Sequence, residues 1–225
     1  MAAHKVYEFF AALDEFEPEI WRRFQVPGDI TLAQLGYVVL TLFEMKASHP
    51  FSMERNFGDE EDGLIEFYEI PSCAPAPAFD GETPKDATAV RLDEVVEAGD
   101  YYAVNYDFGD DWFVVLRLEK ILESKDLPAE DLPRVLKGFG YGIVEDCGGP
   151  PELMKLAKAF RRKKGAEYKE LAEWLGRDEF NINAFDMEDM NFRLKKIPHI
   201  FKKIYEERHE PTQSDIDLIE RGYKK

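Results

Sequence analysis

The sequence predicts an α+β fold: an antiparallel sheet of hairpins packed by an early helix, with a helical C-terminal third. Two observations lead to this prediction. Segments rich in branched and aromatic residues, several of them alternating, fill much of residues 6–120. From Pro150 onward the apolar residues recur at the spacing of a helix face. At 225 residues the chain is long enough to bury a substantial core.

The N-terminal segment predicts two strands and then a helix. Val6 to Leu13 and Ile20 to Val26 read as strands, joined by an acidic turn around Glu15 to Glu19. Thr31 to Gln34 has the pattern of a capping box, so we expect a helix from Leu32 to Lys46. Its core face comprises Leu32, Leu35, Val39, Leu42 and Phe43.

A hairpin is expected next, from Phe51 to Asn56 and from Leu64 to Ile70. The turn between them, Gly58-Asp-Glu-Glu-Asp-Gly63, holds four consecutive acids. We interpret it as a solvated loop, because it lacks the spacing and final glutamate of an EF-hand calcium loop. Residues 71–89, which contain four prolines, are predicted to be an extended connector.

The central hairpin is predicted from Tyr101 to Asp107 and from Trp112 to Lys120, because apolar residues alternate on both sides of Gly109-Asp110. The segment Gly138-Phe-Gly140-Tyr-Gly142, which contains three glycines, is predicted to be a flexible loop. Its length and context do not fit a nucleotide-binding glycine motif.

The C-terminal third predicts helices. Leu153, Leu156 and Phe160 share one helix face, and a second helix from about Tyr168 to Leu175 ends at Gly176. A third is expected from Asp186 to about Lys196. We divide the chain into a domain of residues 1–197 and a helical extension of residues 198–225, which either docks on the domain or extends as an arm.

The charge is unevenly distributed, with a net value of −17 for the chain. Residues 1–150 carry 12 Lys and Arg against 31 Asp and Glu, whereas residues 151–225 carry 17 against 15. The acidic part would repel phosphate backbones, so direct nucleic-acid binding by residues 1–150 is not expected. The basic residues 161–164 and the lysines of residues 195–203 read as solvated helix faces.

No apolar stretch approaches the roughly 20 residues of a membrane helix, and the N-terminus has no pattern of a secretory signal. We therefore expect a cytoplasmic protein that binds no membrane. Cys73 and Cys147 fit that compartment as free thiols, because neither lies in a CxxC motif or near a histidine.

Four ordered segments resemble the plasmid pRiA ORF-three-like family, named for an open reading frame of the Ri plasmid. They are Pro18 to Pro27 followed by Thr31 to Leu35; Tyr106 to Trp112 with Leu118-Glu-Lys120; Glu145-Asp-Cys-Gly-Gly149; and Phe180 to Asn191. The resemblance implies an α+β fold in a bacterial or archaeal protein associated with mobile elements. It implies no assigned activity.

The sequence departs from the family pattern at several positions. The family tends to have histidines where this chain has Gly36, Phe51 and Val114, and His49 remains. A cysteine and paired prolines of the family are replaced by residues 142–144. If relatives use those side chains for a metal, this chain has lost most of that site.

Carboxylates form the main candidate site. Asp107, Asp110, Glu145 and Asp146 could converge on Mg²⁺ or Mn²⁺, which needs two or three carboxylate oxygens and could activate water for phosphoester hydrolysis. Asp residues beside glycine also accept backbone hydrogen bonds in turns, and that role explains Asp107 and Asp110 without a metal. No cofactor is expected unless the hydrolase interpretation holds.

Further candidate binding residues are Asp111, Trp112, Arg22, Arg23 and His49. The arginines favour an ion pair that fixes strand register, with anion recognition as the alternative. His49 could be a general base, but no nucleophile stands in a recognisable motif.

Three functions remain open, and the first two belong to different classes. The first is a non-catalytic, acidic interaction module that binds a basic protein, itself a candidate nucleic-acid-binding protein, with salt-sensitive association. The alternative is a divalent-metal-dependent hydrolase acting on phosphoesters through the acidic hairpin. A third option is a DNA-associated accessory factor that works through the basic helices after Pro150. The sequence does not indicate an oligomeric state.

Overall fold

A single mostly antiparallel sheet organises the chain. The computed structural model describes residues 4–14, 16, 20–57, 64–73, 83–97, 99–125 and 127–221. Within these residues the strands are β1 (His4–Leu13), β2 (Trp21–Pro27), β3 (Phe51–Phe57), β4 (Leu64–Glu69), β5 (Lys85–Asp86), β6 (Tyr101–Tyr106), β7 (Trp112–Ser124) and β8 (Arg134–Phe139). Their order is β5-β4-β3-β6-β7-β1-β2-β8, and β5 pairs with β4 in parallel.

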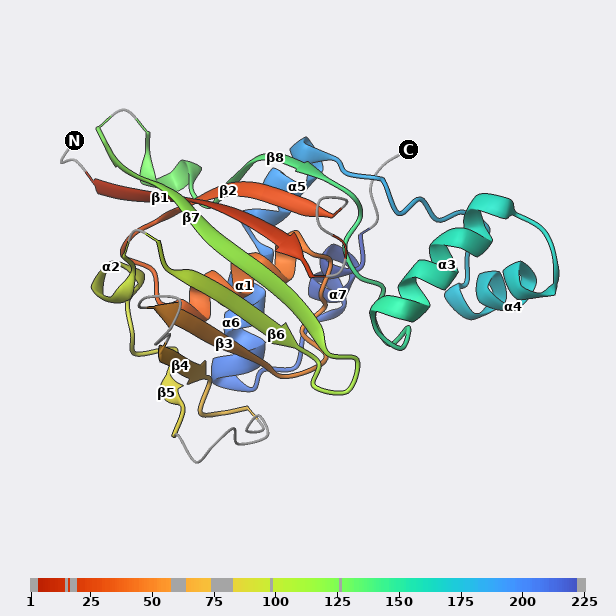
Figure 1. Cartoon of the computed structure of the whole chain (residues 1–225), viewed down its shortest axis with the longest axis horizontal. Coiled ribbons are helices and arrows are strands. Elements are labelled where there is room, and N and C mark those ends of the chain that lie inside the picture. The colour runs from red at the N-terminus through yellow and green to blue at the C-terminus, as the bar shows by residue number, and fades with distance from the viewer. Residues whose placement is uncertain are drawn as a thin grey trace.

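The helices are α1 (Leu32–Leu42), α2 (Leu92–Val95), α3 (Pro150–Arg162), α4 (Ala166–Leu175), α5 (Met187–Leu194), α6 (Ile197–Glu207) and α7 (Gln213–Ile219). Figure 1 shows α1 and α6 behind the sheet, whereas α3 and α4 project beyond one side of it. The predicted α+β class, with helices in the C-terminal part, is confirmed. Among the described residues, no helix combines the length and apolar character that crossing a bilayer requires.

The predicted β1, β2 and α1 are present, and the largest difference in bounds is at the end of α1. Thr31 caps α1 through both bonds of the capping box. The helix ends at Leu42 rather than at Lys46, because Glu44 and Ala47 adopt positive φ angles of 63° and 61°. A left-handed residue cannot continue a right-handed helix, so the chain turns there and leads into β3.

The central position of the β6–β7 hairpin is confirmed by the strand order. Tyr106 pairs with Trp112 and Val104 pairs with Val114, and all four side chains are buried. This face of the sheet meets α1, so the alternation in the sequence indicated the core side correctly.

Three elements differ from the sequence prediction. β5 and the four-residue α2 lie between residues 85 and 95, where β5 falls in the predicted connector. β8 is a strand that the sequence analysis did not predict, and Gly138, expected in a flexible loop, lies within it. Gly138 is required there because a Cβ atom would come within 2.8 Å of Arg22 Cδ and 2.9 Å of the Phe185 ring. The acidic turn at 58–63 and residues 15 and 17–19 lie outside the described residues.

Local caps set the ends of several C-terminal helices. Gly176 ends α4 with a left-handed φ of 68°, Asp186 caps α5, and Thr212 caps α7 through a capping box. The segment after residue 197 packs on the domain: the ring of Tyr205 in α6 stacks on Tyr37 of α1, with centroids 5.7 Å apart. Phe201 of α6 is fully buried.

Candidate metal centre

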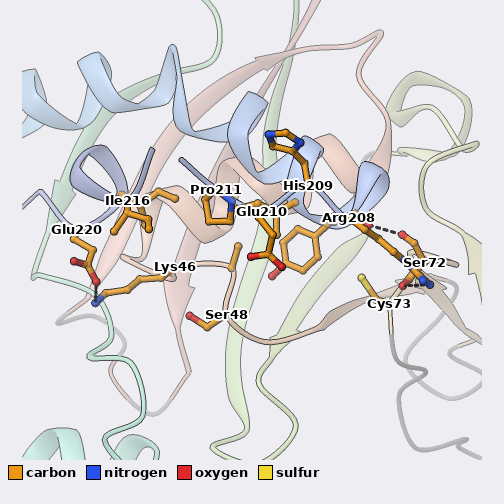
Figure 2. Close-up of a pocket in the computed structure, with 14 residues that line it drawn as sticks. Lys46, Ser48, Ser72, Cys73, Arg208, His209, Glu210, Pro211, Ile216 and Glu220 are labelled. Carbon is orange, nitrogen blue, oxygen red and sulfur yellow. Dashed lines mark hydrogen bonds and ion pairs between the residues drawn. The ribbon is translucent and has the colours of Figure 1, made fainter. Parts of the chain in front are cut away.

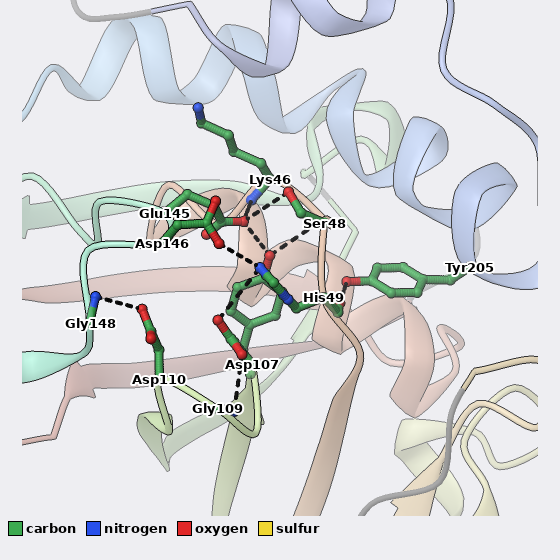
Figure 3. A network of polar contacts seen from close by, with 11 residues as sticks. Lys46, Ser48, His49, Asp107, Gly109, Asp110, Glu145, Asp146, Gly148 and Tyr205 are labelled. Carbon is green, nitrogen blue, oxygen red and sulfur yellow. Dashed lines mark hydrogen bonds and ion pairs between the residues drawn. The ribbon is translucent and has the colours of Figure 1, made fainter. Parts of the chain in front are cut away.

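Three segments that are distant in the sequence meet beside the β6–β7 turn. They are the connection after α1 (residues 43–50), the turn itself (residues 107–111) and the segment before α3 (residues 143–149). The backbone N–H of Ile143 donates to Phe43 O at 2.9 Å, and that of Asp107 donates to Pro50 O at 3.1 Å. Figure 3 shows Asp107 and Asp146 pointing toward His49.

His49 lies between two carboxylates. Its Nε2 atom is 3.0 Å from Asp146 Oδ1 and 3.5 Å from Asp107 Oδ2. One ligand atom from each of the three residues lies within 4.8 Å of the others. Ligand atoms bound to one ion at about 2.1 Å lie roughly 3–4 Å apart, so small rotamer changes would allow all three to bind one ion. The side chains of Asp107, His49 and Asp146 are 13%, 31% and 69% exposed, which leaves one side open to solvent.

The local backbone conformation helps to position both carboxylates. Asp107 and Asp146 have left-handed φ angles of 56° and 58°, a conformation that aspartate and asparagine tolerate better than most residues. Asp107 also has the turn role expected from the sequence, because its Oδ1 atom accepts from Gly109 N at 3.1 Å. Its Oδ2 atom faces His49, so the two oxygens serve different partners.

Glu145 is adjacent to the cluster but faces other donors. Its Oε1 atom accepts from Lys46 N at 3.1 Å, from Ser48 Oγ at 3.3 Å and from the hydroxyl of Tyr106. Burial raises the pKa of Glu145, although these hydrogen bonds oppose that effect. The pKa of Tyr106 is also raised, first by burial and then by the Glu145 charge. Glu145 therefore joins the connection after α1 to strand β6.

The other acidic candidates are engaged at the edge of the cluster. Asp110 Oδ2 accepts from Gly148 N at 3.0 Å, which ties the hairpin turn to the segment before α3. Asp111 Oδ1 accepts from Asn105 Nδ2 at 3.0 Å. Trp112 is fully buried in the core, so its indole does not offer a surface for a ligand.

Arg22 supports the cluster from a distance. Its buried guanidinium donates to the carbonyl oxygens of Leu42, Trp21, Phe139, Gly140 and Tyr141. It also lies 4.2 Å from the centroid of the Phe185 ring. The carbonyls of Leu42, Gly140 and Tyr141 belong to the end of α1 and to the loop after β8, the two stretches that continue into the cluster. Full burial suits this positioning role better than anion recognition from solvent.

Arg23 forms a cross-sheet ion pair of the kind the sequence suggested. Its guanidinium binds Glu119 through two hydrogen bonds of 2.5 Å and 2.8 Å. Because β1 lies between β2 and β7, the pair bridges across one strand. The Arg23 hydrogen bond lowers the pKa of Glu119.

A residue far away in the sequence fixes the histidine backbone. The hydroxyl of Tyr205 in α6 donates to His49 O at 2.6 Å. Sequence analysis had no signal for this contact, which joins residues 156 positions apart. Ser48 and Tyr106 were also not singled out, although Tyr106 stands in the aromatic and acidic motif and Ser48 precedes His49.

Two cavities border the cluster. The first, of about 520 Å³, lies between the connection after α1 and the α6–α7 segment, and Figure 2 shows Ser48, Cys73, Arg208 and His209 along it. The second, of about 460 Å³, is lined by Glu145 and Asp146 and by the end of α4. Lys46 and Glu220, paired at 3.2 Å, line both cavities.

Both cysteines are free thiols, as expected. Burial raises the pKa of Cys73, and burial also raises the pKa of Cys147 to about 11. A thiol with a raised pKa is a poor nucleophile at neutral pH, so neither cysteine adds to the chemistry of the centre.

The donor set suits a transition ion better than magnesium. An imidazole nitrogen with two carboxylate oxygens fits Mn²⁺, Fe²⁺ or Zn²⁺, whereas Mg²⁺ prefers oxygen ligands alone. Three protein ligands leave coordination positions for water and a substrate, as in catalytic metal sites.

Two comparisons with known proteins found similar proteins. A family profile described as plasmid pRiA4b ORF-3-like protein matches residues 5–189. The crystal structure of the protein of unknown function MM3350 from Methanosarcina mazei Go1 is similar, with a TM-score of 0.68 and 25% identity. That match covers 84% of this chain and 97% of the other. A comparison with curated proteins found no match.

Two of the positions at which the sequence departs from the family pattern are in contact. A Cβ atom on Gly36 would lie 2.4 Å from the Phe51 ring, so the phenylalanine fills the space beside the glycine. Val114, at a third such position, is fully buried. These three positions form packed apolar core here, whereas His49 belongs to the polar cluster.

Proposed function

The chain belongs to the plasmid pRiA4b ORF-3-like family, and from the geometry of its candidate metal centre we propose that it is a divalent-metal-dependent hydrolase of phosphoesters. The observation that carries the proposal is the convergence of His49 Nε2, Asp107 Oδ2 and Asp146 Oδ1. This set keeps two of the four carboxylates suggested by the sequence and adds the histidine. Asp110 and Glu145 are positioning residues in the proposal, because their oxygens accept hydrogen bonds from other groups.

The proposed chemistry follows from the ligands. An ion held by one neutral imidazole and two carboxylates would have its formal charge balanced, but it would keep free coordination positions and would lower the pKa of a bound water as a Lewis acid. The resulting hydroxide would attack phosphorus while the P–O bond to the leaving alcohol breaks. Hydrolysis of a diester would consume one water and release an alcohol and a phosphate monoester, and hydrolysis of a monoester would release an alcohol and inorganic phosphate.

The test begins with metal binding. We would measure thermal unfolding after chelation, with Mn²⁺, Zn²⁺, Mg²⁺ or Ca²⁺ added at matched ionic strength. An ion at 100 times its dissociation constant stabilises by about 2.7 kcal/mol, which raises Tm by several degrees in a chain of this size. Mn²⁺ or Zn²⁺ should give the larger shift, and His49→Gln or Asp146→Asn should abolish it.

The matched control is Glu123→Gln, which removes one exposed carboxylate near the far end of β7 and should leave the metal shift unchanged. Hydrolysis is then measured with 4-nitrophenyl phosphate and its bis ester. Loss of turnover in His49→Gln but not in Glu123→Gln supports the proposal. Absence of any ion-specific shift in the native chain would refute it.

An acidic interaction module remains a second candidate, favoured by the excess of 31 acidic over 12 basic residues in positions 1–150. Such a surface accelerates association with basic proteins, and the effect weakens with salt. A lysine-rich peptide is the probe. Binding at 50 mM salt that disappears at 300 mM, and that His49→Gln leaves intact, would favour this function over the hydrolase.

A further inference from the structure

The second cavity beside the metal centre has the size of a small-molecule site. Its volume of about 460 Å³ lies within the usual range for ligand pockets. It runs from Asp146, a member of the cluster, to Trp174 and Arg177 at the end of α4. A ligand in this cavity can therefore contact the centre and α4 together.

Trp174 gives the cavity an aromatic wall. Its side chain lies in the last turn of α4, where Gly176 ends the helix, and the residue is 51% exposed. An exposed indole face that lines a cavity offers a stacking surface for a planar ring. Phe192 of α5 is similarly exposed, at 43%, but does not line this cavity and so provides a comparison.

Arg177 supplies positive charge beside that wall. Its guanidinium carbon lies 5.3 Å from the centroid of the Phe180 ring and 5.8 Å from that of Tyr141, which limits its orientations. Among the described residues, its Nε–H has no hydrogen-bond acceptor although the atom is buried. The side chain also interacts with the Tyr141 hydroxyl, and its positive charge would attract an anionic ligand that enters the cavity.

The acidic groups that line the cavity already have partners. Glu44 binds Arg193 through two hydrogen bonds, Glu220 pairs with Lys46, and Glu145 accepts three hydrogen bonds. Asp146 is the carboxylate that faces the proposed ion. With the ion bound, the charge of Asp146 would be balanced, and Arg177 would supply the positive charge that attracts an anion.

We propose that this cavity binds a phosphate ester carrying a planar aromatic ring, the class to which nucleotides belong. The ring stacks on Trp174, and the phosphate faces the ion held at Asp146, with Arg177 contributing charge. The inference rests on the proposed hydrolase function and names its substrate class. Because the unneutralised carboxylates repel a phosphate, ligand binding should require the ion and strengthen it in return.

The experiment is calorimetry on the full chain with Mn²⁺ present or chelated. The probes are adenosine 5′-monophosphate, phenyl phosphate, ribose 5-phosphate and inorganic phosphate. The two ring-bearing probes should bind about tenfold tighter than the two without a ring, and only with Mn²⁺. Phenyl phosphate distinguishes stacking in general from recognition of a nucleoside: equal binding of both ring-bearing probes indicates that any planar ring suffices.

Variants then assign the contacts. Trp174→Ala should reduce the affinity for adenosine 5′-monophosphate to that for ribose 5-phosphate, whereas Trp174→Phe and Phe192→Ala should retain the difference. Arg177→Gln should weaken all four phosphates. None of these changes should alter the thermal shift with Mn²⁺ alone.

The results distinguish a failure of this inference from a failure of the proposed hydrolase function. Binding of Mn²⁺ with equal affinity for ring-bearing and ringless phosphates overturns this inference and leaves the metal centre standing. Ring selectivity that survives in Trp174→Ala also overturns it. Absence of Mn²⁺ binding overturns the proposed function and this inference together.

Discussion

The hydroxyl of Tyr205 donates a hydrogen bond of 2.6 Å to the backbone carbonyl of His49. The bond links α6, near the C-terminus, to the one histidine of the candidate metal centre. Since Tyr205 is 5% exposed, water cannot readily replace the hydroxyl. The position of the His49 backbone therefore depends on how α6 packs against α1.

Removal of this hydroxyl should weaken metal binding without removing a ligand. Tyr205→Phe leaves the His49 carbonyl unsatisfied, which should lower the free energy of unfolding by about 1–2 kcal/mol and raise the Kd for Mn²⁺. Tyr168→Phe is the matched control, because its hydroxyl also donates to a backbone carbonyl, that of Asp178, at an exposed site. An unchanged Kd in Tyr205→Phe would contradict a positioning role.

Glu145 should make stability decrease as pH rises. Burial raises its folded pKa above the unfolded value of 4.5, so between these two values the folded chain binds more protons than the unfolded chain. Its contribution is therefore fully present below pH 4.5 and is lost as pH rises through the folded pKa. Glu145→Gln keeps an oxygen acceptor for Tyr106 and removes this loss.

Denaturant unfolding of Glu145→Gln in chelator should therefore show a gain relative to the native chain that is larger at pH 8 than at pH 5. Glu123→Gln removes an exposed carboxylate and serves as the control for net charge. A pH-independent difference between Glu145→Gln and the native chain would show that burial does not control this carboxyl.

The Arg23–Glu119 pair should contribute in the opposite direction. Arg23 lowers the folded pKa of Glu119 below the unfolded value of 4.5. The stability from this pair is present above pH 4.5 and is lost as pH falls through the folded pKa. A double-mutant cycle of Arg23→Gln and Glu119→Gln should give a coupling free energy of about 1 kcal/mol at pH 7, because the ion pair is bidentate and partly buried.

The same cycle at pH 3 checks the assignment. The coupling should decline there as Glu119 becomes protonated. Equal coupling energies at pH 3 and pH 7 would mean that the pair acts through packing rather than charge. Arg117, 3.7 Å from Glu119, is retained in all four proteins so that its effect cancels.

Gly138 should be intolerant of a methyl group. Gly138→Ala places a Cβ atom within 2.8 Å of Arg22 Cδ and 2.9 Å of the Phe185 ring, and we expect a loss of about 1–3 kcal/mol. Phe185→Leu in the same chain should recover part of the loss by making room, as measured by denaturant unfolding. If the double variant shows only the sum of the single effects, the clash with Phe185 is not the cause.

Elements set by local pattern could be predicted from the sequence. The Thr31 capping box and Gly176, which ends α4, act through residues that are close in the sequence, so the sequence alone indicates both. The alternation of the β6–β7 hairpin likewise follows from the pleat, which places every second side chain on the core side.

Strand β8 and the end of α1 could not be predicted in this way. β8 is stabilised by pairing with β2, more than 100 residues earlier in the chain, and by the Arg22 side chain beneath Gly138. The chain leaves the helical conformation at Glu44, and the carboxylate of Glu44 binds Arg193, which lies 149 positions later in the sequence. Such long-range contacts override local helix and loop preference.

The candidate metal centre likewise has features that the sequence determined and features that depend on the tertiary structure. The sequence by itself determined the α+β class, the family resemblance, the charge asymmetry and the presence of Asp107, Asp146 and His49 as polar residues at loops. Only the tertiary structure decided that Asp107 and Asp146 face His49 while Asp110 and Glu145 accept other hydrogen bonds. The physical reason is that side-chain direction at a loop depends on the left-handed backbone at residues 107 and 146 and on segments brought together by the sheet and α6.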